Sequence, residues 1–142
     1  MPSILFCWLG KTDIDAMHRR DPADVGPIAR ALQYFVQQGL SLHRLVLLSN
    51  YDPTRYDPLP FIEWLQPSLD TLQAVADVCI ASFPNPTDFR AIYETVTEAL
   101  DAADEASAPE PVRRYFHLSP GTSAMTAVWL LLGKTTYPAT LL

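Results

Sequence analysis

The feature of this sequence that most restricts its fold is a regular alternation of short apolar runs with longer amphipathic stretches. Such an alternation is typical of β-α units, in which parallel strands are joined by helices that cover the sheet. The first run, residues 3–9, is apolar at nearly every position, as expected for a strand buried on both faces. A chain of 142 residues suits one domain with a single core. The sequence therefore predicts one α/β domain over residues 1–142, Rossmann-like, with a mainly parallel sheet of five to six strands and helices on both faces.

Five apolar runs are expected to form the strands of this sheet: residues 3–9, 44–49, 76–82, 113–118 and 137–142. Helices are expected over residues 27–39 and 58–72, after an N-cap formed by Asn85-Pro86, and over residues 122–132. The polar segment 10–26 is expected to be an unusually long connection. Because the chain ends inside its last apolar run, we expect it to be the N-terminal part of a longer regulator.

Charge and composition exclude several classes of protein. The formal net charge of −6 argues against a surface that grips long nucleic acid, and Lys11 and Lys134 are the only lysines. Any phosphate site must therefore be local. No apolar run approaches the ~20 residues of a membrane span, and no basic segment precedes the first apolar run as in a signal peptide. We expect a cytoplasmic protein without membrane contact, with Cys7 and Cys79 as reduced core thiols.

Two loops with the composition of an anion site are expected to meet at one edge of the sheet. In doubly wound sheets a ligand lies beyond the carboxyl ends of the strands, where the strand order reverses. In the commonest order the first and fourth strands are neighbours at that point. The loops that follow them are Gly10-Lys11-Thr12-Asp13 and Ser119-Pro120-Gly121-Thr122-Ser123. The second loop combines a glycine, three hydroxyls and the start of a helix, whose free amides attract anions.

These loops suggest a division of roles around a phosphate-bearing ligand. Gly10, Lys11 and Thr12 are expected to neutralise and orient a phosphate, while the hydroxyls and amides of residues 119–123 donate hydrogen bonds. Asn50 and Asn85, each just past a strand end, are expected to contact base or ribose. Taken alone, residues 119–123 are explained equally well as a capped turn, because Ser and Thr are favoured N-caps. The cation of Lys11 and the hydroxyl of Thr12 on the neighbouring loop favour the interpretation as a ligand site.

Several familiar catalytic motifs fail on spacing. Gly-Lys-Thr occurs at 10–12 and 133–135, but a P-loop also needs a glycine where this chain has Leu5 and Val128. The sequence contains no G-x-G-x-x-G dinucleotide motif and no G-x-S-x-G nucleophile elbow. The three histidines lack the paired spacing of a zinc site, and His117 is expected to be a core or supporting residue. We expect no cofactor, no metal and no catalytic residue.

Residues 116–125, Phe-His-Leu-Ser-Pro-Gly-Thr-Ser-Ala-Met, resemble the second motif of CARF domains, the CRISPR-associated Rossmann fold. There a strand leads into a Gly-Thr loop and a helix that begins small-x-Met. The wider pattern resembles most the N-terminal sensor of RtcR-like, sigma-54-dependent regulators of RNA-repair operons. The segments that carry this wider resemblance are 10–13, 26–28, 47–50, 85–89 and 118–142.

The resemblance implies a homodimer whose ligand loops meet near a two-fold axis, and a ligand that is a cyclic oligoadenylate or RNA ending in a 2′,3′-cyclic phosphate. It also implies a downstream ATPase module and a DNA-binding domain. One departure concerns the ligand, because many CARF domains carry a lysine where this chain has Ser123. A ligand-sensing domain without enzymatic activity is the leading hypothesis. The alternatives are a ring nuclease that cleaves cyclic oligoadenylate and a pure dimerisation or docking module.

Overall fold

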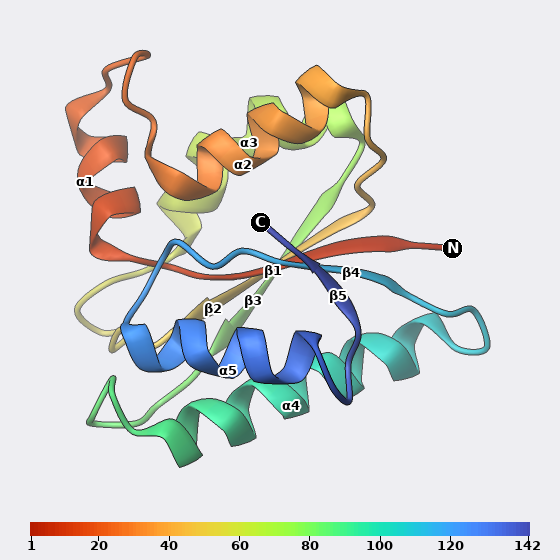
Figure 1. The fold of residues 1–142 in the computed structure, drawn as a ribbon. Helices are drawn as coiled ribbons and strands as arrows, with labels where there is room; N and C mark the ends of the chain where they lie inside the picture. The colour runs from red at the N-terminus through yellow and green to blue at the C-terminus, as the bar shows by residue number, and fades with distance from the viewer.

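A computed structural model describes residues 1–142 and contains one parallel sheet (Figure 1). Its strands are β1 (Ser3–Trp8), β2 (Arg44–Ser49), β3 (Val75–Ile80), β4 (Arg113–Phe116) and β5 (Ala139–Leu141). They run parallel in the order β3-β2-β1-β4-β5. The predicted α/β Rossmann-like fold is therefore confirmed, with five strands. The expected neighbourhood of the first and fourth strands is also confirmed, since β1 pairs with β4 from Ser3 to Phe6.

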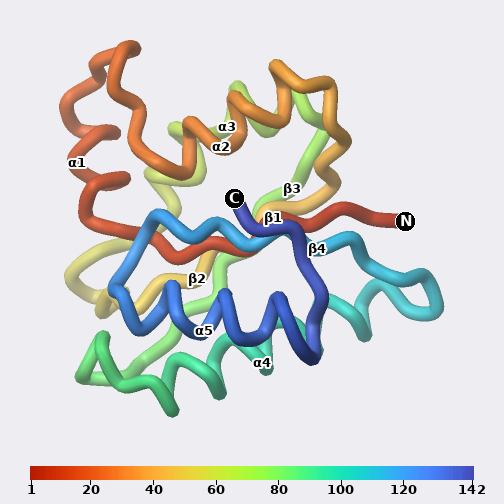
Figure 2. Tube along the Cα trace, viewed as in Figure 1, coloured from red at the N-terminus to blue at the C-terminus, as the bar shows by residue number.

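Helices cover both faces of the sheet. They are α1 (Lys11–Arg19), α2 (Gly26–Gln38), α3 (Leu59–Leu72), α4 (Phe89–Ser107) and α5 (Ser123–Gly133). Figure 1 shows α1, α2 and α3 on one face, with α4 and α5 on the other. The Cα trace in Figure 2 shows the same two layers, and it places the start of α1 and the start of α5 at one edge of the sheet.

The central strand β1 divides the core into two apolar clusters. All six of its side chains are buried. Leu5 and Cys7 pack against α2 and α3, whereas Ile4, Phe6 and Trp8 pack against α4 and α5. This alternation is what a strand with helices on both sides requires, because successive side chains point to opposite faces. The uniform hydrophobicity of residues 3–9 therefore follows from the central place of β1.

The long polar connection expected over residues 10–26 contains a helix that was not predicted, because the segment begins with α1. Gly10 occupies the N-cap, and the Asp13 carboxylate accepts a hydrogen bond from the Gly10 amide at 3.1 Å. Ile14 and Met17 pack against the core cluster on that side. The helix is short and most of its residues are polar, so the segment has the composition of a loop.

The start of α4 also differs from the prediction. Asn85 does not cap this helix; its Oδ1 accepts hydrogen bonds from the amide and the hydroxyl of Thr87 and so closes a turn. Asp88 is the N-cap, with its carboxylate accepting from the Ala91 amide at 3.2 Å. Both residue types are good caps, and the intervening turn moves the start of the helix to Phe89.

Both cysteines are free thiols, with Cys7 buried and Cys79 half-buried. Burial raises the pKa of each thiol above its ordinary value, and that of Cys7 by more. Neither is therefore activated as a nucleophile. None of the five helices has the length and hydropathy needed to span a bilayer.

Candidate functional site

The loops that follow β1 and β4 touch each other through their glycines. A Cβ atom placed on Gly10 would lie 3.3 Å from the Gly121 amide nitrogen and 3.6 Å from the Pro120 Cβ. Gly121 has a φ of +92°, and a Cβ there would lie 2.6 Å from the Met125 sulfur. Only glycine adopts this conformation without strain and leaves room for Met125. The two predicted ligand loops are therefore in backbone contact.

On the β1 side of the site, Asp13 joins the loop to the helix behind it. Its side chain is 1% exposed, and its two carboxylate oxygens accept from the amides of Gly10 and Ile28, at 3.1 and 2.9 Å. Burial raises the pKa of Asp13 to about 6, although the hydrogen bonds from backbone amides lower it. The carboxylate thus fixes the start of α1 against the start of α2, and both of its oxygens are already engaged within the scaffold.

On the β4 side, the Thr122 hydroxyl has two partners. It accepts from the Met125 amide at 3.3 Å, as the N-cap of α5, and donates to the Pro86 carbonyl at 2.8 Å. Pro86 belongs to the loop that follows β3, so this hydrogen bond ties together two loops at the same edge of the sheet. Asn50 acts similarly, because its Oδ1 accepts from the Phe83 amide at 3.2 Å.

The loops enclose a cavity of about 660 Å³, which we call the crevice. Nine of the predicted site residues line it: Gly10, Lys11, Thr12, Asp13, Asn50, Ser119, Pro120, Gly121 and Thr122. The remaining lining residues are Leu9, Pro27, Tyr51, Phe83, Pro84, Pro86 and Met125. Asn85 and Ser123, the other two predicted site residues, are exposed and do not line the crevice.

Two helix N-termini open at the crevice and make it suited to an anion. The first-turn amides of α1 and α5 have no carbonyl partners within their helices, and the helix dipole adds positive potential there. Lys11, the first residue of α1, contributes a cation. Its Nζ lies 2.7 Å from the Asp15 carboxylate in an exposed pair, and this partner raises the pKa of Lys11. Exposed pairs of this kind are weak, so the ammonium can turn to a bound phosphate.

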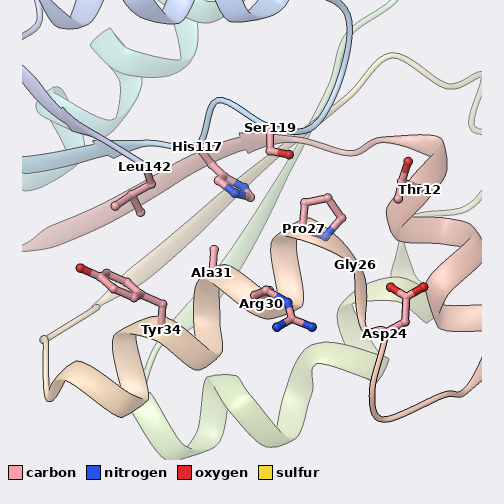
Figure 3. Close-up of a pocket in the computed structure, with 10 residues that line it drawn as sticks. All are labelled: Thr12, Asp24, Gly26, Pro27, Arg30, Ala31, Tyr34, His117, Ser119 and Leu142. Carbon is pink, nitrogen blue, oxygen red and sulfur yellow. The ribbon is translucent and has the colours of Figure 1, made fainter.

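A second cavity of about 560 Å³ adjoins the crevice, and we call it the side cavity (Figure 3). Its lining residues are Thr12, Asp24, Gly26, Pro27, Arg30, Ala31, Tyr34, His117, Ser119 and Leu142. Thr12, Pro27 and Ser119 line both cavities. Arg30, Tyr34 and Leu142 are not among the residues predicted from the sequence. For Arg30 and Tyr34 the only signal is their i+3 and i+7 spacing from Pro27, which places them on one face of α2.

The fold and the crevice together define the class of this protein: a Rossmann-like α/β domain with a crevice at the carboxyl edge of its sheet. The chain matches no family model, and no curated protein is similar to it in sequence. Among solved structures, it is similar to *Enterococcus italicus* Csm6 bound to cyclic hexa-2′-fluoro-hexa-dAMP, with a TM-score of 0.68 and 17% sequence identity. The match covers 99% of this chain and 32% of Csm6, so the chain spans about a third of its length.

At this identity the likeness shows the fold alone. It supports the Rossmann-like fold, while the resemblance to CARF domains and the closer one to regulators of RNA-repair operons stay predictions. No group of three histidine, cysteine or carboxylate side chains lies close enough together to hold a metal ion.

Proposed function

We propose that this chain is a ligand-sensing domain of the CARF type that binds a cyclic oligoadenylate. One observation carries the proposal: glycine-containing loops from two adjacent strands, and the N-termini of two helices, converge on one crevice. A phosphodiester is the ligand chemistry that free amides, hydroxyls and one mobile ammonium favour. A protein of the same fold, Csm6, has been solved with a cyclic hexanucleotide analogue bound.

The chain's own groups divide the work of binding. The backbone of Gly10 and Gly121 allows a phosphate to approach closely, because neither residue has a side chain. Lys11 and Thr12 supply charge and a hydroxyl from α1, and Ser119 supplies a hydroxyl from the opposite loop. Because the Thr122 hydroxyl also donates to the Pro86 carbonyl, a ligand that contacts the start of α5 would also affect the position of the loop after β3.

The proposal extends to binding without turnover. The two buried groups with the most shifted pKa values near the crevice are Asp13, whose oxygens are taken by amides, and His117, whose pKa burial lowers to about 4. The Asp13 carboxylate has a pKa that would suit a general base, but both of its oxygens are held by backbone amides, and His117 with a pKa near 4 is a weak base. Cleavage of a cyclic oligoadenylate would show instead that the chain is a ring nuclease. The absence of any nucleotide binding would favour a docking module.

The resemblances over residues 116–125 and over the wider segments 10–13, 26–28, 47–50, 85–89 and 118–142 support three further parts of the proposal. The domain forms a homodimer in the cytoplasm, and ligand binding changes the geometry of that dimer. It reports to a sigma-54-dependent ATPase and a DNA-binding domain further along a longer chain. RNA that ends in a 2′,3′-cyclic phosphate is the alternative ligand, because it presents the same phosphodiester to the crevice.

A thermal-shift panel tests the ligand class. The purified chain is heated with cyclic tri-, tetra- and hexa-adenylate and with short RNAs that carry a 2′,3′-cyclic phosphate. A ligand at a hundred times its dissociation constant should add about 2.7 kcal/mol of stability. The same samples are analysed for linear product and for oligomeric state.

A matched pair of lysine variants locates the binding. Lys11→Ala should weaken binding about tenfold, the loss expected for one charge-assisted contact to phosphate. Lys134→Ala removes the other lysine, which is exposed just after α5, and should change nothing. Equal effects of the two variants, or the absence of any ligand-induced shift, would refute the proposed site.

A further inference from the structure

The side cavity holds the one buried histidine of the chain, and its imidazole has unused hydrogen-bonding capacity. His117 is 7% exposed, and its Nδ1 atom is buried without a hydrogen-bond partner. Figure 3 shows the ring directed from the end of β4 toward α2, opposite Pro27 and beside Ser119. Nδ1 is closed off from the cavity as it stands, but the His117 side chain makes no hydrogen bond within the protein and its accessible part lines the cavity, so the ring has capacity left for a guest.

The other walls of the side cavity have the chemistry of a nucleoside site. Tyr34 and Arg30 come from the exposed face of α2, and Tyr34 is 44% exposed, with its ring free on the cavity side. Leu142 supplies an apolar wall from the end of the chain. Aromatic rings, guanidinium planes and aliphatic side chains are the surfaces on which nucleobases pack. A volume of about 560 Å³ lies within the usual range for small-ligand pockets.

The position of the side cavity ties it to the crevice. Thr12, Pro27 and Ser119 line both cavities and form the boundary between them. A phosphate held at the crevice by the starts of α1 and α5 would therefore place the attached nucleoside within reach of His117.

We infer that the side cavity is a nucleoside subsite, in which an adenine base packs on Tyr34 and hydrogen-bonds to the His117 imidazole while its phosphate occupies the crevice. This inference rests on the proposed function and adds the recognition of the base to it. Burial lowers the pKa of His117 to about 4, so the ring is neutral at pH 7 and offers one donor and one acceptor. Adenine presents the same combination along its edge. Arg30 is placed to stack on the base or to meet a second phosphate.

Adenosine without phosphate tests the subsite separately from the crevice. The ring resonances of the three histidines are followed by NMR during titration with adenosine and then with cyclic hexa-adenylate. Those of His117 should move with both ligands. Those of His43, whose Nδ1 accepts from the Ser3 amide at 3.0 Å near the opposite end of the sheet, should not.

The outcomes separate the two proposals. Movement of His117 with adenosine, but no binding of any cyclic oligoadenylate, would support the subsite and refute the proposed messenger. Binding of cyclic oligoadenylate while His117 stays unmoved by either ligand would overturn the subsite and leave the proposed function standing. If neither ligand binds, both proposals fail.

Two variants distinguish a ligand group from a structural one. His117→Leu replaces an unpartnered buried ring by an apolar side chain, so the protein should keep or gain stability while it loses adenosine binding. Tyr34→Ala should weaken adenosine binding about tenfold, the loss expected when a base loses an aromatic partner. Tyr93→Ala is the matched control, because Tyr93 is a comparably exposed tyrosine (38%) on α4, across the sheet. Loss of stability in His117→Leu together with full adenosine binding would refute the inference.

Discussion

The two loops of the crevice follow the same plan but are held in place by different chemistry. Each runs from a buried strand through a glycine into the first turn of a helix. In the β1 loop the fixing group is the buried carboxylate of Asp13, and both of its amide partners belong to the scaffold. In the β4 loop it is the half-buried hydroxyl of Thr122, which binds a neighbouring loop, together with a positive φ at Gly121 that only glycine adopts without strain. The difference indicates that the β1 loop is the rigid wall of the site and the β4 loop the adaptable one.

The largest expected effect comes from removing the rigid element. Asp13→Ala leaves the amides of Gly10 and Ile28 without an acceptor in a buried place, which should cost about 2–4 kcal/mol of unfolding free energy. Thr122→Ala removes one N-cap and should cost about 1 kcal/mol. Urea denaturation of the two variants measures both losses of unfolding free energy. Equal losses would remove the distinction between a rigid and an adaptable loop.

Alanine substitution of the two glycines gives the next largest difference. Gly121→Ala forces a left-handed conformation on alanine and brings its Cβ against Met125, which should cost about 1–3 kcal/mol. Gly10 has a φ of −108°, which any residue adopts. A Cβ atom added there would lie 3.3 Å from its nearest neighbours, the Asp13 carboxylate and the Gly121 amide nitrogen. Gly10→Ala should therefore cost less, below about 1 kcal/mol. Chemical denaturation checks the order, and a larger loss in Gly10→Ala would show that the contact between the loops, not the strain, limits the site.

The smallest effect is expected in the pH dependence of wild-type stability, because two buried groups oppose each other. Burial raises the pKa of Asp13 to about 6 from 3.8, so its contribution to stability is present below pH 3.8 and is lost as pH rises through 6. Burial lowers the pKa of His117 to about 4 from 6.5, so its contribution is present above pH 6.5 and is lost as pH falls toward 4. Between pH 4 and 6 these two contributions should partly cancel.

Single variants separate the two titrations. In His117→Leu the Asp13 contribution remains, so stability should rise relative to wild type as the pH falls from 6.5 to 4. In Asp13→Asn the His117 contribution remains, and stability should fall over the same range. Denaturation midpoints at pH 7, 5.5 and 4 measure both slopes. Identical pH profiles for the two variants would show that neither group is buried as the structure describes.

Much of the fold follows from local patterns in the sequence. β2 occupies the predicted residues 44–49, because an apolar run bounded by His43 and Asn50 leaves little choice of boundary. The adjacency of β1 and β4 follows from the strand order of doubly wound sheets. α1 was missed because most of its nine residues are polar, as in a loop, and its N-cap is a glycine that gives no signal by itself.

The candidate site was only partly predictable. Residues that follow strand ends, such as Lys11 and Ser119, could be placed together from topology. The inward direction of the Asp13 carboxylate could not be predicted, because its partner Ile28 lies fifteen residues away on another helix. The side cavity depends on the face that α2 turns toward the ends of β4 and β5. That orientation is set by packing and not by local sequence.

The central position of β1 has a practical consequence for experiments in solution. Its amides lie between two strands and under helices on both faces, so they should exchange with deuterium only when the whole domain opens. The amides of the first two residues of α1 and of α5 have no partners within their helices and should exchange rapidly until an anion covers them. One exchange experiment therefore contains its own reference: β1 reports global opening, and protection that appears only at the two helix starts is the footprint of the ligand.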